Sequence, residues 1–492
     1  MNGWSGFFGA LVGVLAASAA GVGMALLGLR TAARRLEAAW GEDPSRNWVE
    51  LLFSLESTSA REIALTAQRA QTGEPARHPM GSPHFVAPYL DQIGFDPATL
   101  APPSLSRHSR PRLTTVLGPA AERPLVLDLP VFVAPMGYGV GLNEAAKTAL
   151  AEAATLAGTA TSTGEGPFLS EERALAYRWI LQLGRGPFNH QAETIRLADM
   201  VEIQVGQGSE AGTGVDKRRR AVPRRVRRAL DHRPGPVRIR GGLPRPLAAW
   251  VRRVRRANPT VPLGVKIPAS QHLEADLERL VALGVDVITV DGSEAGSASS
   301  PAVISDHAGI PAAVAVVRAR RWLDAHEVGR RISLVASGGV RGAADVAKLL
   351  ALGADAVAVG SVILLAASHG QVTRRGWARG PAALVLAEPL NVALDVDEAA
   401  ERAANWFLAT AQELRLLCQA LGVNDVHAIR RQHLVAYTRE AGRLFGVGFV
   451  GQPAPTVTDS VTALVKGYRR LNRELARIGR AVSAWSNPDG EG

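Results

Sequence analysis

Cysteine is almost missing from this chain of 492 residues, which contains one, Cys418. A single thiol excludes an internal disulfide and leaves too few thiolates for an iron–sulfur cluster or a cysteine-built zinc site. Redox chemistry in this chain therefore needs an organic cofactor, and we expect no metal site. Cys418 follows the stretch 414–417, which is mostly apolar and favours a buried helix thiol over a nucleophile.

Lysine is scarce, because only five of the 56 basic residues are lysines. The net charge of +11 is concentrated in one block, since 16 basic residues and a single acid lie between Lys217 and Arg256. Nucleic acid is a disfavoured partner, because Trp250 is the only aromatic residue in the block that could stack on a base. The block 217–256 instead predicts contact with an anionic membrane surface, and a solvated helix face is the alternative.

Charge is also absent from the first 29 residues, and Phe7–Leu29 is almost wholly apolar. That length is sufficient to cross the hydrocarbon core of a bilayer. A basic region is missing at the start, which favours an uncleaved transmembrane anchor over a signal peptide. Arg30 and the arginines after it predict a single-pass protein of the cytoplasmic membrane with its main domain in the cytoplasm. A buried N-terminal helix is the alternative.

The residue pattern of the chain changes at about residue 126. Helical patterns with proline-rich connections give way to short β-branched runs that alternate with amphipathic stretches. Such alternation is typical of repeated βα units around a parallel sheet. We expect four parts: an anchor at 1–30, a packed extension at 31–125, a main domain at 126–435 with the basic insertion 217–256, and a helical extension and tail at 436–492.

Eight apolar runs in the main domain predict the strands of a (β/α)8 TIM barrel in the α/β class, whose catalytic groups lie at the carboxyl ends of the strands. Helical stretches follow most of these runs, at 143–156, 271–283, 312–325 and 342–352. The expected strands are Val131–Ala134, Thr159–Thr161, Trp179–Leu183, Val201–Val205, Leu263–Ile267, Val285–Val290, Ile332–Ala336 and Ala356–Val359.

Glycine-rich turns end the last two expected strands, at Ser337, Gly338 and Gly339 and again at Gly360 and Ser361. Exposed backbone N–H groups at two adjacent strand ends, followed by helix N-termini, form an anion site. In many barrels this is where a phosphate binds. The paired spacing therefore favours a phosphate site over simple tight turns.

Charged side chains end several of the other strands. Lys266 lies among apolar residues of the fifth strand, and a buried ammonium needs an anionic partner nearby, such as a reduced flavin or a substrate carboxylate. An ion pair within the barrel is the alternative. Glu165, Asp291 and Glu294 lie in small-residue loops at the same end, where they either bind substrate or cap helices.

Seven motifs in order resemble the FMN-binding synthase domain of glutamate synthase, and more closely its stand-alone bacterial and archaeal relatives. The similarity extends from about residue 125 to 435. The motifs are Ala134-Pro135-Met136-Gly137, Thr163-Gly164-Glu165-Gly166, Trp179-Ile180-Leu181-Gln182, Gly206-Gln207-Gly208, Lys266, Val290-Asp291-Gly292-Ser293-Glu294, and Ser337-Gly338-Gly339 with Gly360-Ser361.

The resemblance implies an FMN-dependent oxidoreductase that acts on a 2-oxo acid or an amino acid. It implies that Lys266 stabilises negative charge on the reduced flavin and that Glu165 handles the amino or carboxylate group of the substrate. Substrate contacts are implied for Gln207, Asp291, Glu294 and Ser297. The implied FMN contacts are Ala134, Pro135, Met136, Thr163, Gln182, Lys266, Ser337, Gly338, Gly339, Gly360 and Ser361.

The chain departs from the family pattern on the electron and substrate sides. No cysteine lies in 366–386, where the family places its cluster ligands, and no counterpart of the amidotransferase domain is recognisable, so a separate subunit is expected to supply electrons or ammonia. The loops at 209–212 and 295–298 differ from the family's substrate loops. The alternative is therefore a catalytically silent flavin-binding or scaffold subunit at the membrane.

Overall fold

The computed structural model describes most of the main domain and parts of the flanking segments. The expected anchor at 1–30, Ser297 and most of the basic insertion lie outside the described residues. The described residues are 31, 90–100, 103–139, 141–186, 188–208, 215–217, 237–239, 243, 246–296, 300–369, 394–452, 468 and 473–478.

Eight parallel strands form the centre of the molecule, and each lies within two residues of its predicted position. The predicted α/β barrel is therefore confirmed. In the order of their hydrogen-bonded neighbours the strands are β4 (Val131–Val133), β13 (Ala356–Val359), β12 (Ser333–Ser337), β11 (Val287–Asp291), β10 (Leu263–Pro268), β7 (Met200–Gln204), β6 (Arg178–Leu183) and β5 (Ala160–Ser162).

The barrel is nearly closed at the seam between its first and last strands. No strand ladder among the described residues joins β4 to β5. Two other hydrogen bonds bridge them, from Thr159 Oγ1 to the Val131 carbonyl at 2.5 Å and from the Asp128 N–H to the Gly158 carbonyl at 2.9 Å. These contacts hold the seam together without a regular ladder.

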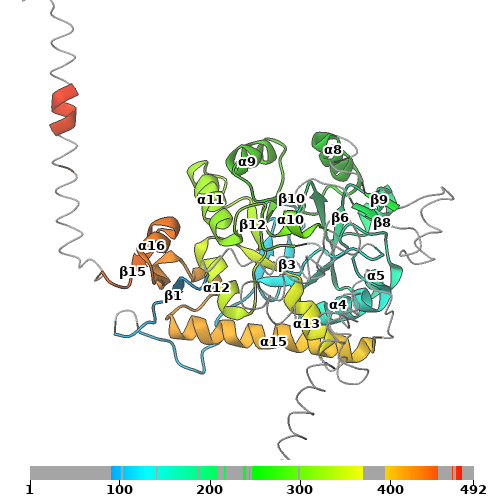
Figure 1. Ribbon diagram of the computed structural model, residues 1–492, viewed down its shortest axis with the longest axis horizontal. Helices are drawn as coiled ribbons and strands as arrows, with labels where there is room; N and C mark the ends of the chain where they lie inside the picture. Colours follow the sequence, from blue (N-terminus) through cyan, green and yellow to red (C-terminus); the bar gives the residue numbers. More distant parts are fainter. Residues whose placement is uncertain are drawn as a thin grey trace, which may run out of the picture.

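Helices cover the outside of the barrel (Figure 1). Four were predicted with nearly correct bounds: α4 (Glu144–Leu156), α9 (Leu273–Ala282), α11 (Ala312–Ala325) and α12 (Ala343–Leu352). The others around the barrel are α5 (Ser170–Leu175), α6 (Ala192–Arg196), α8 (Leu247–Ala257), α10 (Ala302–Ser305) and α13 (Ser361–Ser368).

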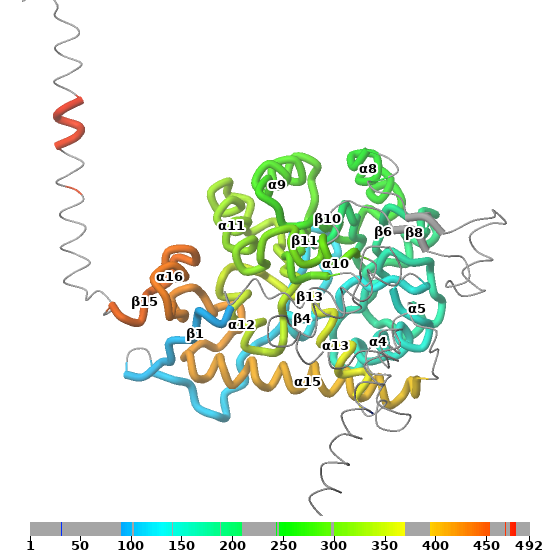
Figure 2. The backbone as a smooth tube through the Cα atoms, in the orientation of Figure 1, coloured from blue at the N-terminus to red at the C-terminus, as the bar shows by residue number. Residues whose placement is uncertain are grey.

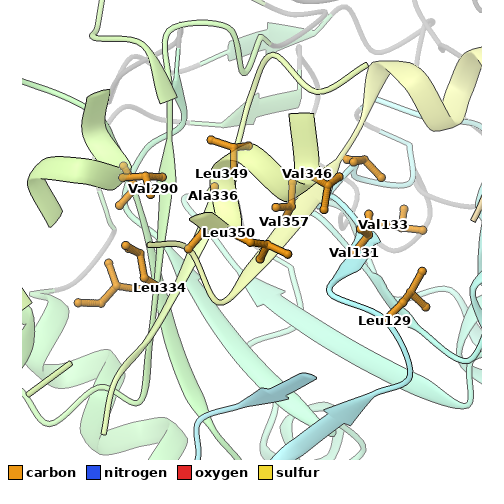
Figure 3. Close-up of a cluster of buried hydrophobic side chains, with 14 of the residues drawn as sticks. Leu129, Val131, Val133, Val290, Leu334, Ala336, Val346, Leu349, Leu350 and Val357 are labelled. Carbon is orange, nitrogen blue, oxygen red and sulfur yellow. The ribbon is translucent and has the colours of Figure 1, made fainter. Parts of the chain in front are cut away.

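The outward-facing strand residues pack against these helices. Figure 3 shows Leu334, Ala336 and Val357 of the sheet beside Val346 and Leu350 of α12. All five side chains are at most 2% exposed. This apolar layer fixes the strands against the helices, so that the strand ends have defined positions.

A long helix, α15 (Val396–Ala420), lies outside the ring of barrel helices and contacts α4, α12 and α13 (Figure 1). Only the part around Cys418 was predicted to be helical. Cys418 lies on α15 and is fully buried. Burial raises the pKa of the Cys418 thiol to about 12, with Asp425 adding to the effect. A thiol with that pKa is a poor nucleophile at neutral pH, in agreement with a buried helix thiol.

A hairpin from the N-terminal extension closes one end of the barrel. It consists of β2 (Thr115–Leu117) and β3 (Leu125–Leu127), and the Gly118 N–H donates to Ser333 Oγ at the start of β12. Its leucines pack with inward-facing side chains from the amino ends of the strands. We call this apolar layer the barrel floor: Leu117, Leu125, Leu127, Phe132, Ile180, Met200, Val287 and Val335.

A second small sheet joins the N-terminal extension to the C-terminal part of the chain (Figure 2). It comprises β1 (Ile93–Phe95), β14 (Leu434–Ala436) and β15 (Gly448–Phe449). The C-terminal part also contains the 3-10 helices η5 (Val426–Ala428) and η6 (Arg431–His433) and helix α16 (Arg439–Phe445).

The described part of the basic block contributes to the fold. Strands β8 (Val215–Lys217) and β9 (Val237–Ile239) pair antiparallel. In α8, Trp250 is buried, Arg253 Nε donates to the His190 carbonyl at 2.9 Å, and Arg255 forms an ion pair with Asp286 at 2.7 Å. At least two arginines of the block therefore bind the barrel itself, and an anionic membrane surface as partner has no support.

The expected localisation in the cytoplasmic membrane is wrong on the structural finding. Within the part of the chain that the structure describes, no helix combines the length and apolar character needed to span a bilayer. The segment 1–30, on which the prediction was based, is not among the described residues. Tethering to a membrane therefore has no support.

Candidate active site

Above the barrel floor, the interior-facing residues change from apolar to polar. Because side chains alternate along a strand, the position two residues beyond a floor residue faces the interior again. Those positions are occupied by Gln182, Glu202, Thr289 and Ser337, and the equivalent position of β10 by Lys266. All five are buried. The carboxyl end of the barrel is thus lined by polar groups that lie above the apolar barrel floor.

Lys266 and Asp291 form a buried ion pair in this layer. Lys266 Nζ lies 2.8 Å from Asp291 Oδ2, and the two side chains are 4% and 2% exposed. Asp291 Oδ2 also accepts the N–H of Gly208 at 3.2 Å, whereas its Oδ1 is buried without a partner among the described residues. Lys266 therefore has its anionic partner within the barrel, which is the alternative that the sequence left open.

Glu202 lies beside this pair and is fully buried in β7. Its Oε1 accepts from Gln182 Nε2 at 2.8 Å and its Oε2 accepts from Thr289 Oγ1 at 2.7 Å. Burial raises the pKa of the Glu202 carboxyl above its ordinary range, and the charge of Lys266 opposes this rise. Asp291 is thus the carboxyl group paired with the ammonium, and Glu202 is the one that burial favours as the neutral acid.

Gln182 and Thr163 belong to one hydrogen-bonded unit. Thr163 Oγ1 accepts the backbone N–H of Gln182 at 2.9 Å and donates to the Gly164 carbonyl at 3.0 Å. The side-chain oxygen of Gln182 is buried and has no partner among the described residues. Two residues expected at the flavin are therefore adjacent, and one of them presents an unsatisfied acceptor.

The loop after β4 lies against the loops after β5 and β13. A Cβ added at Gly164, which has a φ of +65°, would lie 2.6 Å from the Met136 nitrogen, so only glycine allows this approach. A Cβ at Gly360 would lie 3.9 Å from both Ala134 Cβ and Met136 Sδ. The segment from Ala134 through Pro135 to Met136 thus lies between the second strand end and the expected phosphate turn.

The expected phosphate turn follows β12 and β13. Gly338 and Gly339 have φ angles of +117° and +71°, a conformation that favours glycine. Gly360 precedes α13, which begins at Ser361, and Ser337 ends the neighbouring strand β12. The β12 and β13 ladder brings the two strand ends side by side, so the five predicted phosphate positions are adjacent.

Glu165 is engaged by an arginine that the sequence did not single out. Its Oε1 accepts from the backbone N–H and Nε of Arg185 at 2.8 and 3.1 Å, and its Oε2 accepts from Nη2 at 3.0 Å. Gln204 Nε2 approaches Oε2 at 3.4 Å. A bidentate contact of this kind fixes the orientation of both side chains.

The other residues expected to contact substrate differ in their surroundings. Glu294 caps α11, because its Oε2 accepts the Ala312 N–H at 2.9 Å, and burial raises its pKa. This is the helix-cap alternative. Gln207 is half-buried beside Gly208, at the end of β7 where the ion pair lies. Ser297 lies outside the described residues.

Besides Arg185, sequence reasoning missed Glu202 and Arg341. Glu202 carried a usable signal, because Glu202 and Gln204 alternate with apolar Val201 and Ile203, which points both polar residues to one side of the strand. Arg341 follows the Gly338-Gly339 turn, where Asp345 and Asp91 hydrogen-bond to it and raise its pKa. Asp345 lies four residues after Arg341, at a spacing that permits such a pair, whereas nothing local in the sequence indicates Asp91.

The residues present fit FMN. The glycine turns at 338–339 and 360 suit a phosphate, and the unpartnered buried oxygen of Gln182 suits an N–H group of the flavin ring. Lys266 places a positive charge in the same polar layer. Among the residues that the structure describes, no cluster of three or more histidine, cysteine or acidic side chains could hold a metal ion.

Comparison with known proteins identifies the family. The model of the conserved region in glutamate synthase matches residues 104–424. A glutamate synthase large subunit-like protein of Rhizobium meliloti is 30% identical over 399 residues, which cover 74% of this chain and 88% of the relative. The archaeal-type glutamate synthase (NADPH) of Dehalococcoides mccartyi is 29% identical over 421 residues, which cover 78% and 82%.

Among solved structures, a mandelate oxidase variant aligns with 72% of this chain and 92% of its own at 18% identity and a TM-score of 0.47. The chain belongs to the glutamate synthase family and is an FMN-dependent oxidoreductase.

Proposed function

We propose that the chain catalyses the reductive amination of a 2-oxo acid. In this reaction ammonia and the 2-oxo acid condense to an imine with loss of water, and the imine gains a hydride and a proton to give the amino acid. When bound, FMN supplies the hydride. The names of the relatives, which are glutamate synthases, make 2-oxoglutarate the first substrate to test.

The observation that carries this proposal is the buried Lys266–Asp291 pair at the carboxyl ends of β10 and β11. A fixed ammonium in a dry site stabilises negative charge much more strongly than one in water. Asp291 holds that ammonium in place, and the polar layer around the pair is the part of the barrel where catalysis occurs in this fold. Lys266 therefore serves as the electrostatic group of the site.

Glu165 acts in this proposal by positioning Arg185. Both Glu165 oxygens accept from that guanidinium, whose side chain is fully buried. An oriented arginine recognises planar carboxylates. We therefore assign the substrate's carboxylate or amino end to the neighbourhood of Glu165 and Arg185, and contacts with the rest of the substrate to Gln207 and Asp291.

Electrons and ammonia come from outside this chain in the proposed scheme. The sequence has one cysteine, too few for the cluster that carries electrons in larger members of the family. A separate subunit or a reduced nucleotide must then reduce the cofactor. NADPH is the first reductant to test, because the relatives' names specify it.

A second candidate function is a flavin-binding subunit without catalysis. It is favoured by the internal partners of Lys266 and Glu165, which are Asp291 and Arg185. A charged side chain that is already paired within the protein contributes less to the binding of a charged substrate than an unpaired one does. The two candidates differ in whether the reduced cofactor reacts with an imine.

A reoxidation experiment separates them. The full chain is purified, saturated with FMN and photoreduced without oxygen, and 2-oxoglutarate with ammonium is then added. We expect the flavin absorbance to return and glutamate to form in equal amount. Glutamate is measured by mass spectrometry with nitrogen-15 ammonium, and samples lacking either substrate are the controls.

The outcomes are distinct. Stable reduced flavin with every 2-oxo acid tried would support the subunit without catalysis. Reoxidation by another 2-oxo acid would keep the proposed reaction and change its substrate. A folded chain that binds no FMN at saturating concentration would contradict both candidates.

A further inference from the structure

The unpartnered oxygen of Gln182 exists because another residue determines how its amide group is turned. An amide has a donor end and an acceptor end, and a rotation of half a turn exchanges them. Gln182 Nε2 donates to Glu202 Oε1 at 2.8 Å. The amide oxygen is consequently left buried without a partner among the described residues.

Glu202 is itself held from two sides. Its Oε2 accepts from Thr289 Oγ1 of β11, and its Oε1 faces Gln182 of β6. Gln182 of β6 pairs with Glu202 in the adjacent strand β7, whereas Thr289 lies on β11, which is separated from β7 by β10. The carboxyl group therefore has little freedom, and it offers an acceptor to Gln182.

We propose that Glu202 is a positioning residue of the flavin site, which turns the Gln182 amide so that its oxygen is free to accept a hydrogen bond from an N–H group of FMN. Glu202 does not touch the cofactor in this scheme and acts through Gln182. The inference rests on Gln182 contacting FMN and does not depend on which substrate the enzyme reduces.

The buried oxygen of Gln182 carries a cost unless a ligand satisfies it. An unmade hydrogen bond of a buried polar group is unfavourable, so native structures rarely leave one without a functional reason. The flavin ring has an N–H donor in its oxidised state. A bound flavin would thus remove the cost, and the site would gain affinity from it.

The hydrogen bond from Gln182 to Glu202 is possible in either protonation state of Glu202. The groups that face it are Gln182 from β6, Lys266 from β10, and Thr289 and Asp291 from β11. Asp291 is closest to the ammonium of Lys266, at 2.8 Å. Burial raises the pKa of Glu202, but an acceptor oxygen remains for Gln182 in the neutral acid as well as in the carboxylate.

A double-mutant cycle on the full chain tests the proposal. The variants are Glu202→Met, Gln182→Met and the double variant, because methionine conserves the unbranched shape and removes the hydrogen-bonding groups. Glu202→Gln is the rescue variant, since its amide oxygen still accepts from Gln182. The readout is the Kd of FMN, measured by quenching of flavin fluorescence, together with the absorption spectrum of the bound flavin.

We expect Glu202→Met to weaken FMN binding about tenfold and Glu202→Gln to change it less than about twofold. Gln182→Met should weaken binding to the same extent as Glu202→Met, and adding Glu202→Met to Gln182→Met should have little further effect. Glu401→Gln, which alters an exposed carboxyl group of α15, should leave the Kd of FMN unchanged.

Equal weakening by Glu202→Met in the presence and absence of Gln182 would overturn the positioning role. A Gln182→Met variant with unchanged Kd would show that Gln182 does not contact FMN, and the inference would fail while the proposed reaction stood. If Glu202→Met does not fold, Gln182→Met is compared with the double variant. The double variant removes both members of the Gln182–Glu202 hydrogen bond, although Thr289 Oγ1 loses its acceptor there. A weaker Kd in the double variant than in Gln182→Met contradicts the proposal.

Discussion

Lys147 of α4 and Glu172 of α5 form an ion pair that is almost wholly excluded from water. Lys147 Nζ lies 2.9 Å from Glu172 Oε1, with side-chain exposures of 0% and 1%. The same ammonium donates to the Ser162 carbonyl at 2.6 Å, at the edge of β5 where no ladder joins it to β4. Lys147 therefore stabilises the open seam of the barrel next to Thr163.

Removal of this lysine should destabilise the protein strongly. Lys147→Met leaves the Glu172 carboxyl buried without its cation and the Ser162 carbonyl without a donor, which together cost about 3–5 kcal/mol in the free energy of unfolding. Urea unfolding followed by circular dichroism measures the change. The double variant Lys147→Met with Glu172→Gln should recover part of the loss, because it leaves no buried charge.

The penalty of Lys147→Met should also depend on pH. Burial raises the pKa of Glu172 above its ordinary value of 4.5, against the opposing charge of Lys147. Stability from a raised carboxyl pKa is fully present below the unfolded value and is lost as pH rises through the folded value. Without Lys147 the folded pKa rises further, so Lys147→Met should cost more at pH 7 than at pH 5. An equal cost at both pH values would contradict this.

Gly338 provides a matched test of the phosphate turn. Gly338→Ala places a Cβ 2.9 Å from the Ala295 nitrogen at a φ of +117°. The strain should cost about 1–3 kcal/mol in stability, and displacement of the backbone N–H groups should weaken FMN binding at least about tenfold. Fluorescence titration with FMN measures the Kd.

The control for Gly338 lies four residues further along the chain. Gly342 has extended backbone, and a Cβ there meets nothing within 4 Å. Gly342→Ala should therefore leave both stability and FMN affinity close to the parent values. If Gly338→Ala and Gly342→Ala bound FMN with equal affinity, the assignment of the phosphate to this turn would be contradicted.

Lys266 should set the reduction potential of the bound flavin. Lys266→Met removes the positive charge that stabilises reduced flavin, so the midpoint potential should become more negative by on the order of 30 mV, which corresponds to about 1.4 kcal/mol for two electrons. Equilibration with a reference dye during slow reduction measures it. Lys348→Met is the control, because Lys348 lies on α12 and donates to the Leu90 carbonyl. An unchanged potential in folded, FMN-loaded Lys266→Met would contradict the assigned role.

The barrel could be predicted from the sequence because its signal is local. Each strand is a short β-branched run such as Ile332–Ala336, and the observed strand Ser333–Ser337 differs by one residue at each end. Most of helix α15 was missed because it lies outside the βα repeats, although it has the aspartate N-cap Asp395 that commonly begins a helix. Local sequence patterns thus predicted the repeating part of the fold and not the full length of the helix that packs outside α4, α12 and α13.

The partners within the site could not be predicted in the same way. Lys266 was expected to have an anionic partner, but its pairing with Asp291 depends on the register of β10 against β11. Arg185 and Glu165 are likewise joined by the arrangement of two loops. Register and loop packing are properties of the whole barrel, so these contacts appear only in the three-dimensional structure.

His427 should make the protein less stable in mild acid. It lies in η5, which contacts α12 and α15, and its Nε2 is 2.9 Å from Thr115 Oγ1 of β2. Burial lowers the pKa of His427 below its ordinary value of 6.5, against weaker opposing effects of Asp355 and Asp425. The folded protein thus keeps this imidazole neutral at a pH where the unfolded chain binds a proton.

The difference between the folded and unfolded pKa values of His427 determines how stability changes with pH. Because the folded pKa is depressed, the unfolded state binds more protons below pH 6.5, and the stability present above that pH is lost as the pH falls toward the folded value. Each unit of pKa difference contributes about 1.4 kcal/mol. His427→Gln, which keeps a polar group near Thr115, should lose less stability than the parent between about pH 7 and 5. Urea unfolding at several pH values measures the difference, with His108→Gln at an exposed position as control. A parent and a His427→Gln variant with the same pH dependence would show that His427 is not the group responsible.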